Sequence, residues 1–144
     1  MKVNIELSKE YVPPYAVIYA DAVTDEIKRS IDLLGMSEAP IIAQKEERME
    51  VIRPDDIYMI RVEGGETVIF TEKEMFFSRK RLYEILQQLG PGFMQISKQT
   101  VIKLSRVKSV EAGFSGTLLL KLSNGSSDYV SRTYLPEFKK YLGL

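Results

Sequence analysis

From residue 40 onward, short apolar runs alternate with polar turns, and this alternation limits the folds open to the chain. The turns include the tetrapeptide Glu63-Gly64-Gly65-Glu66 and the dipeptide Asn124-Gly125. Glycine and asparagine adopt the positive φ angles that two-residue hairpin turns require, so these turns favour antiparallel pairs of strands. We therefore predict a mainly β (α+β) fold of antiparallel sheets with short helices. The expected strands lie at residues 41–43, 49–52, 57–62, 67–71, 107–110, 118–122 and 128–130.

Two segments have helical periodicity instead. In the first, the apolar positions fall at i, i+3, i+4 and i+7, which is the stripe of an amphipathic helix: Leu82, Ile85, Leu86 and Leu89. Ser78 is a favourable N-cap residue, and Gly90-Pro91-Gly92 would end this helix. The second segment, residues 134–142, predicts a short helix with Leu135, Phe138, Tyr141 and Leu142 in the core.

The first 37 residues have a different pattern and are predicted to form a small β/α extension. Val3, Ile5 and Leu7 alternate with polar residues, as in a half-exposed strand, and residues 15–20 predict a second strand. Thr24 would cap a helix that ends at Gly35. We expect residues 1–37 to be a packing or dimerisation extension and residues 38–144 to be the main domain.

The composition argues against an enzyme. The chain has no cysteine and no histidine, so it lacks the commonest general base, the commonest metal ligand and every nucleophile–histidine pair. Asp55-Asp56 follows Pro54 and fits a turn better than a metal-binding pair. We expect no cofactor and no bound metal. With no signal-peptide pattern and no apolar run long enough to span a membrane, the sequence predicts a soluble cytoplasmic protein.

The net charge of zero conceals two halves of opposite sign. Residues 1–77 contain nine Lys and Arg against sixteen Asp and Glu, a net charge of −7; residues 78–144 contain eleven against four, a net charge of +7. The halves could attract each other within one fold or in a dimer, or the basic half could bind nucleic acid. Residues Arg79–Arg81, at the start of the basic half, fit a solvated face better than phosphate contacts.

A polar, lysine-bearing break interrupts the apolar residues between Phe93 and Arg106. Ser97, Lys98 and Gln99 lie between runs that include Ile96 and Val101, so they would form the tip of a strand pair. These side chains donate hydrogen bonds, which suits a polyanion. Arg132 is expected where the strand at 128–130 ends. Taken alone, Lys98 and Arg132 fit surface salt bridges better than ligand contacts.

Taken together, these motifs resemble the LytTR DNA-binding domain of bacterial transcription regulators. The resemblance covers about Pro40 to the C-terminus, and the motifs occur in the family's order and spacing. They are Tyr58-Met59-Ile60, the 81–84 helix segment, the run from Gly92 to Ile102, Val107-Lys108-Ser109, Asn124-Gly125 and Val130-Ser131-Arg132-Thr133-Tyr134. The short N-terminal segment is similar to that of stand-alone LytTR regulators.

The resemblance implies how the protein would bind double-stranded promoter DNA. In the family, loops at one edge of a mainly β fold enter successive major grooves, often at direct repeats. By this resemblance Arg132 would be the principal base reader, with Ser131 and Thr133 on phosphate. Lys98 would reach a base or a nearby phosphate, with Ser97, Gln99 and Thr100 beside it.

This sequence departs from the family at the hairpin of residues 63–66. Family members commonly place a basic residue there, whereas this tip contains Gly65 and Glu66, and Glu66 would repel phosphate unless it accepts a hydrogen bond from a cytosine amino group. The acidic hairpin therefore leaves an alternative open, a protein-interaction module with reduced or lost DNA binding. A homodimer formed through the edge of the strand at residues 3–7 is a further expectation.

Overall fold

The computed structural model describes residues 1–35 and 41–144, which belong to two separate units, residues 1–36 and 37–144. The expected boundary between residues 37 and 38 lies outside the described residues. Strands of the larger unit are β1 (Ile41–Lys45), β2 (Arg48–Ile52), β3 (Met59–Glu63), β4 (Glu66–Phe70), β5 (Met75–Ser78), β6 (Phe93–Gln95), β7 (Thr100–Lys103), β8 (Val107–Ala112), β9 (Leu118–Leu122) and β10 (Ser127–Val130). Its helices are α2 (Leu82–Leu89) and α3 (Leu135–Leu142).

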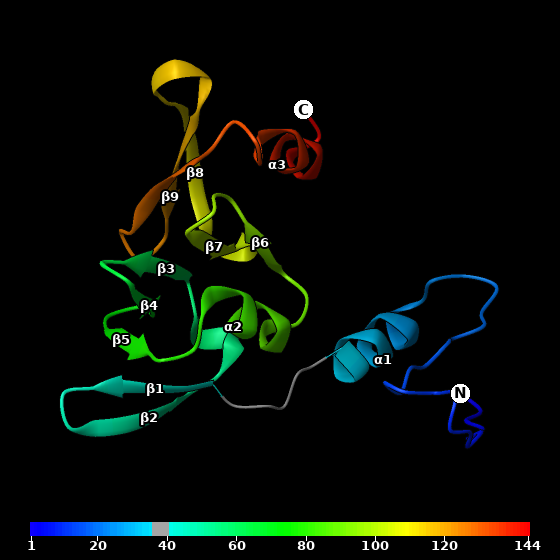
Figure 1. Ribbon diagram of the computed structural model, residues 1–144. Coiled ribbons are helices and arrows are strands. Elements are labelled where there is room, and N and C mark those ends of the chain that lie inside the picture. Colours follow the sequence, from blue (N-terminus) through cyan, green and yellow to red (C-terminus); the bar gives the residue numbers. More distant parts are fainter. Residues whose placement is uncertain (36–40) are drawn as a thin grey trace. The chain divides into compact units, whose positions relative to one another are not determined.

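The strands form two antiparallel sheets, as the sequence predicts. The larger sheet has the order β2-β1-β5-β4-β3-β7-β6 and the smaller one has the order β10-β9-β8. Figure 1 shows the β8–β9 hairpin projecting from the rest of this unit. The hairpins predicted at residues 63–66 and at Asn124-Gly125 are confirmed, with Glu63 paired to Glu66 and with Gly64 and Gly65 at φ angles of 57° and 81°.

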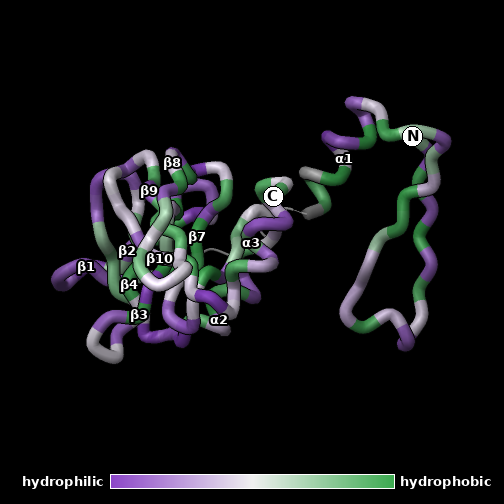
Figure 2. The backbone as a smooth tube through the Cα atoms, turned by 90° about the horizontal axis from the view of Figure 1, so that it is seen from above, coloured by the Kyte–Doolittle hydropathy of each residue, from purple (hydrophilic) through white to green (hydrophobic). Residues whose placement is uncertain are grey.

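The central strands β3, β4 and β7 are buried on both faces. One face packs against α2 in a core that includes Ile60, Ile69 and Val101. The adjacent residues Met59, Val68 and Ile102 point to the other face and pack against the smaller sheet and α3. Since neighbouring side chains of a strand point to opposite faces, two covered faces require the continuous apolar runs seen in these strands. Figure 2 shows hydrophilic residues at turns near β1 and β3.

The segment before α2 differs from the prediction. Ser78 is not the N-cap: it is the last residue of β5, a strand that was not predicted, and α2 begins at Leu82 after Arg81. Burial alternates along Met75-Phe76-Phe77, since Phe76 is buried and both of its neighbours are exposed. This period of two is that of a strand. Arg79–Arg81 therefore form a loop between β5 and α2 and do not belong to the first helical turn.

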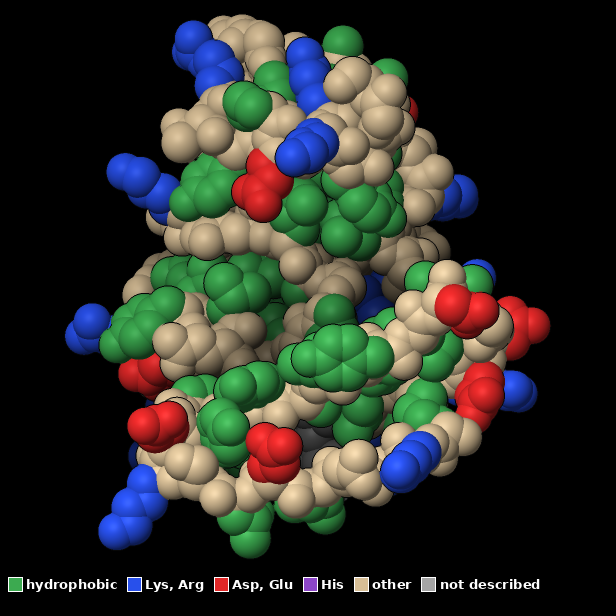
Figure 3. Space-filling view, turned by 90° about the vertical axis from the view of Figure 1, so that its right-hand side faces the viewer, with side chains coloured by type: hydrophobic (Ala, Val, Ile, Leu, Met, Phe, Trp, Pro, Cys, Tyr) green, Lys and Arg blue, Asp and Glu red, His purple; other side chains and the backbone are tan. Residues whose placement is uncertain are grey.

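The smaller unit contains one helix and no strand in its described residues. Helix α1 (Asp25–Gly35) begins after Thr24, whose hydroxyl oxygen accepts a hydrogen bond from the Ile27 amide at 3.3 Å, as predicted. The strands predicted at residues 3–7 and 15–20 are absent, because no other described segment pairs with their backbone. Most of the large apolar residues described in this unit are exposed, among them Val3, Ile5 and Leu7. Figure 3 shows several hydrophobic side chains at the molecular surface. No helix in the described ranges has the length and apolarity to cross a membrane.

The C-terminal helix is attached mainly through Phe138, with Tyr134 and Leu135 packed at the margin of the same core. Phe138 is completely buried against the smaller sheet and the central strands, whereas Tyr141 is 52% exposed and Leu142 is 36% exposed. Of the four core residues predicted in this helix, only Phe138 is fully buried, and Leu135 packs at the margin. An eight-residue helix has little intrinsic stability, so this contact holds α3 in place.

We predict that Phe138→Ala lowers the free energy of unfolding by about 3 to 5 kcal/mol, because it leaves a cavity at a fully buried site. Urea denaturation followed by circular dichroism measures this change. Tyr141→Ala in the same helix is the control and should cost less than about 1 kcal/mol, since its side chain is half exposed. Equal losses for the two variants would show that the burial of Phe138 does not fix the helix.

Candidate nucleic-acid interface

Four loops meet at one edge of the larger unit. Pairing of β3 with β4 places the 63–66 hairpin at this edge, and pairing of Thr67 with Ser78 brings the following loop, Arg79–Arg81, beside it. The amide of Val62, near the end of β3, donates to the Gln99 carbonyl oxygen at 2.9 Å, so the β6–β7 loop lies at the same edge. The fourth loop, residues 131–133, joins β10 to α3.

The predicted polar tip is a tight turn at the start of β7. The amides of Ile96 and Ser97 both donate to the Thr100 carbonyl oxygen, at 2.9 and 3.4 Å, and the Gln99 amide donates to the Ser97 hydroxyl oxygen at 3.3 Å. These bonds hold the backbone and leave the side chains of Lys98 and Gln99 exposed. The tip therefore presents an ammonium group and an amide from a backbone that is already ordered.

The loop that carries Arg132 lies beside this tip. The Ser131 amide donates to the Ile96 carbonyl oxygen at 2.9 Å, which joins the end of β10 to the start of the tip. The Tyr134 amide then donates to the Ser131 carbonyl oxygen at 3.0 Å, forming a turn in which Arg132 and Thr133 are exposed and Ser131 is half-buried. The structure thus brings together the two groups of site residues that the sequence suggested, although about 30 residues separate them.

A polar network joins strands β3, β7 and β10 next to the two loops. Arg61 of β3 donates to the Asp128 carboxylate at 3.4 Å, and the Thr100 hydroxyl donates to the same carboxylate oxygen at 2.6 Å. Arg61 also stacks over the ring of Phe70, at 5.2 Å from its centroid. No local sequence pattern indicates this network, because Arg61 and Asp128 are 67 residues apart and only the fold brings them together.

The position of Thr100 differs from the expectation that it contacts DNA. Thr100 is 1% exposed, and its hydroxyl already donates to Asp128. A side chain that is buried and bonded in this way cannot reach a ligand at the surface. Thr100 instead positions the tip from within.

The acidic hairpin is less repulsive than its sequence suggests. The Glu63 carboxylate accepts two hydrogen bonds from the Arg61 guanidinium, so its charge is compensated within the domain. Glu66 is exposed and forms no ion pair with any described residue. Gly65 has no side chain, so it lets a ligand approach the backbone closely.

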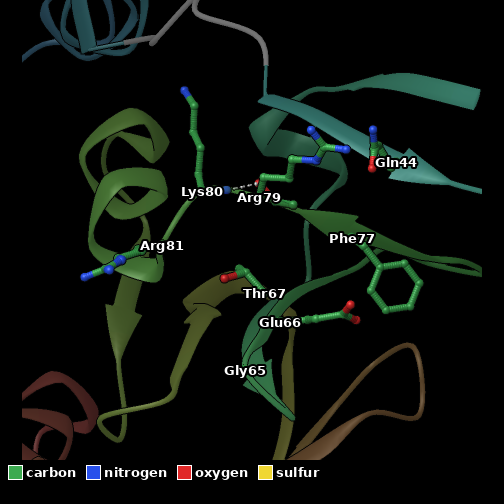
Figure 4. A pocket seen from close by; sticks show the side chains of 9 residues that line it. Gln44, Gly65, Glu66, Thr67, Phe77, Arg79, Lys80 and Arg81 are labelled. Carbon is green, nitrogen blue, oxygen red and sulfur yellow. Dashed lines mark hydrogen bonds between the residues drawn. The ribbon is translucent and has the colours of Figure 1, made fainter.

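The sequence alone did not indicate that the loop Arg79–Arg81 lies at this edge. All three side chains are exposed, and none forms an ion pair with a described residue. The helical periodicity that follows the loop suggested a helical turn, and only the register of β5 shows that the loop ends at the same edge as the tip. The three residues and Glu66 line a hollow, and Figure 4 shows the three basic side chains leaving this loop in different directions.

Several other cations of the larger unit are used within the fold. Lys103 and Arg106 both donate to the Asp55 carbonyl oxygen, at 3.1 and 3.3 Å. Lys45 donates to Glu74 at 2.9 Å, and this hydrogen bond together with the lysine charge lowers the pKa of Glu74. That pair joins the turns at the opposite edge of the sheet. Five cations of the loop edge form no ion pair with the described residues: Arg79, Lys80, Arg81, Lys98 and Arg132. Elsewhere in the larger unit the same holds for Arg53, Lys73, Arg106, Lys108, Lys139 and Lys140.

The chemistry of this edge is that of an anion-binding surface. Guanidinium, ammonium, amide and hydroxyl groups donate hydrogen bonds to phosphate oxygens and to the acceptors on base edges. Among residues 1–35 and 41–144 there is no group of three carboxylates that could hold a metal ion. The edge can therefore bind an extended anion through side chains and backbone amides.

Comparisons with known proteins agree with this chemistry. The family model of the LytTr DNA-binding domain matches residues 47–143. A sensory transduction protein LytT of Enterococcus faecalis is 32% identical over 111 residues, which are 76% of this chain and 46% of that protein. A LytR of Streptococcus agalactiae is 32% identical over 80% of this chain and 44% of its own length. The chain thus spans about half the length of these two relatives.

Two further matches extend the comparison. An uncharacterized HTH-type transcriptional regulator of Staphylococcus aureus is 22% identical over 100% of this chain and 99% of its own length. The solved LytTr DNA-binding domain of a Bacillus cereus methyl-accepting/DNA response regulator superimposes with a TM-score of 0.68. That match covers 74% of this chain and 99% of the other at 18% identity, so it confirms the fold.

We predict that Asp128→Ala lowers the free energy of unfolding by about 1 to 3 kcal/mol, because the buried Thr100 hydroxyl loses its acceptor. Thermal or urea unfolding measures the change. Glu63→Ala is the matched control: it removes another carboxylate partner of Arg61 from an exposed position and should cost less than about 1 kcal/mol. A negligible loss for Asp128→Ala would contradict the supporting role given to the network.

Proposed function

The chain belongs to the LytTR family of DNA-binding domains, and on that premise we propose that it regulates transcription by reading the major groove of specific promoter sites through its edge loops. One observation carries the proposal. The Ser131–Ile96 backbone hydrogen bond sets two ordered loops side by side, and each loop has an exposed cation, Arg132 in one and Lys98 in the other. The major groove is about 12 Å wide, so side chains on ordered loops can reach the base edges within it. Recognition of this kind requires no recognition helix.

Arg132 is the principal base reader in this proposal. Its guanidinium is exposed at the second position of a hydrogen-bonded turn, and the planar fork of an arginine matches the O6 and N7 atoms of guanine. Ser131 and Thr133, on either side, contact phosphate and fix the register of the loop on the duplex.

The β6–β7 tip makes the second set of contacts. Lys98 reaches a base edge or a nearby phosphate, and Ser97 and Gln99 donate from the same turn. Gly65 and Glu66 extend the interface at the hairpin, where Glu66 accepts from a cytosine amino group if it faces a base. A protein with this task needs no catalytic group and works in the bacterial cytoplasm, where the chromosome lies.

We also propose that two copies act together on direct repeats in the promoter. Strands β1, β2 and β5 are covered by α2 on one face only, and apolar side chains remain exposed on the other: Ile42, Met49, Val51, Met75 and Phe77. Burial of such side chains between copies would favour association. An interaction module without DNA binding finds less support, because Arg61 compensates Glu63 of the acidic hairpin.

The roles of Arg132 and Lys98 predict different effects of mutation. Arg132→Ala should lose about 1 to 3 kcal/mol of discrimination between the promoter of its own operon and unrelated DNA, because a base contact is removed. Lys98→Ala, if it contacts phosphate, should weaken binding to both duplexes equally and reduce the slope of log K against log salt by about 1. Fluorescence anisotropy titrations at several salt concentrations measure both quantities.

Wild-type protein must bind its promoter duplex at low salt for these comparisons, and no binding under that condition would refute the proposed function. Arg132→Lys is an informative companion to Arg132→Ala, since lysine keeps the charge and loses the planar fork. It should retain general affinity and lose discrimination. Full discrimination in both Arg132 variants would assign base reading to another residue.

If two copies act together, the mass of the protein–DNA complex should depend on the number of binding sites in the duplex. Sedimentation of the protein with a duplex containing two sites should show two copies per duplex, and a duplex with a single site should bind one copy more weakly. One copy on both duplexes at saturating protein would contradict the two-copy proposal while leaving DNA binding intact.

A further inference from the structure

The loop Arg79–Arg81 lines a hollow of about 500 Å³ at the loop edge. Its other walls include Gln44 of β1 and the hairpin residues Gly65 and Glu66. Figure 4 shows the basic side chains arising from the loop between β5 and α2, with Glu66 on the strand below them. The hollow is open to solvent and polar, which suits part of an extended ligand better than an enclosed small molecule.

The charges of this hollow favour an anion. Three cations and one carboxylate line it, which gives a net charge of +2 from Arg79, Lys80, Arg81 and Glu66. The three cations form no ion pairs with the described residues, unlike Lys45, Arg61 and Lys103 elsewhere in the larger unit. Exposed cations without an ion pair contribute little to the stability of the fold, so the placement of three of them in one loop is not explained by stability.

The spacing of the strands relates this loop to the tip. In the sheet order β5-β4-β3-β7, three inter-strand steps separate the strand that ends at Ser78 from the strand that begins at Thr100. At about 4.8 Å a step, the loops at these strand ends are about 14 Å apart. The major groove of B-DNA is about 12 Å wide. When the Lys98 tip is in the groove, a loop at this distance lies just outside it, where long basic side chains can extend back to the phosphates along its border.

We propose that Arg79–Arg81 form a binding site for backbone phosphates of the DNA strand that borders the groove entered by the Lys98 tip. The proposal rests on the function proposed above and adds a phosphate site that supplies affinity without sequence discrimination. It also accounts for the acidic hairpin: the basic charge that the hairpin lacks comes from the next loop in space. Glu66, facing the same hollow, then moderates the attraction.

The test compares the triple variant Arg79→Ala, Lys80→Ala, Arg81→Ala with wild type in the full chain. Anisotropy titrations use the promoter duplex and an unrelated duplex over a series of salt concentrations. Affinity for both duplexes should fall by the same factor, and the slope of log K against log salt should decrease by about 0.9 for each phosphate that the variant no longer neutralises. The ratio of the two affinities should not change, because phosphates carry no sequence information.

Two control variants separate the loop from charge in general. Lys73→Ala removes an exposed cation from the β4–β5 turn at the opposite edge, and this variant should bind DNA as wild type does. The single variant Lys80→Ala should instead bind both duplexes more weakly. Arg79→Lys combined with Arg81→Lys keeps both charges and should retain the salt slope. Urea denaturation should give wild-type stability for all of these variants, since the substituted side chains are exposed.

The outcome distinguishes this inference from the function on which it rests. If wild type binds the promoter duplex and the triple variant keeps both its affinity and its salt slope, the phosphate site is refuted and the function stands. A loss of discrimination with an unchanged slope would also refute it, because that result belongs to a base reader. If wild type binds neither duplex at low salt, the proposed function itself fails.

Discussion

The candidate interface depends on the packing of the smaller sheet and α3 against strands β3, β4 and β7 of the larger one. This packing buries Leu120, Val130 and Phe138 and carries the end of β10 to the start of the β6–β7 tip, where the Ser131 amide bonds to the Ile96 carbonyl oxygen. Without the second sheet, the Arg132 loop would have no fixed position relative to Lys98. Stability and recognition are therefore linked: the buried contacts that hold the two layers together also order the loops, so little conformational entropy is left to lose on binding.

The distribution of charge explains how a protein of zero net charge can present a basic surface. The antiparallel register gathers the loops at 79–81, 97–99 and 131–133 at one edge, while the turns at the other edge contain Glu46, Glu47, Glu72 and Glu74. Two cations near that second edge are paired, Lys45 with Glu74 and Lys103 with Asp55, whereas Lys73 in the β4–β5 turn is exposed. The three loops of the basic half thus lie at one edge of the larger unit, and an acidic group of turns lies at the other. Such an arrangement orients an approaching polyanion toward the loops, and added salt weakens the effect.

Local patterns predicted the hairpins and the mainly β class, because each depends on residues close in sequence. Gly64, Gly65 and Gly125 adopt the positive φ angles that such turns need. The apolar pairs in β3, β4 and β7 fit the two covered faces that the structure shows. Contacts between distant segments were not predictable in the same way. The support of Thr100 by Asp128 and Arg61 depends on tertiary packing, as does the place of Arg79–Arg81 after β5. The predicted N-terminal strands failed for a related reason: alternation indicates a strand only where another strand is available to pair with it.

The most direct measurement of the central claim is an NMR titration of the full chain with a duplex from the promoter of its own operon, following the backbone amides. We expect the largest shifts at the four loops of one edge, residues 63–66, 79–81, 97–99 and 131–133. The amides of the turns at 46–47 and 71–74 should hardly change. If the largest shifts fall at those turns, or if none of the four loops responds, the edge described here is not the surface that binds DNA.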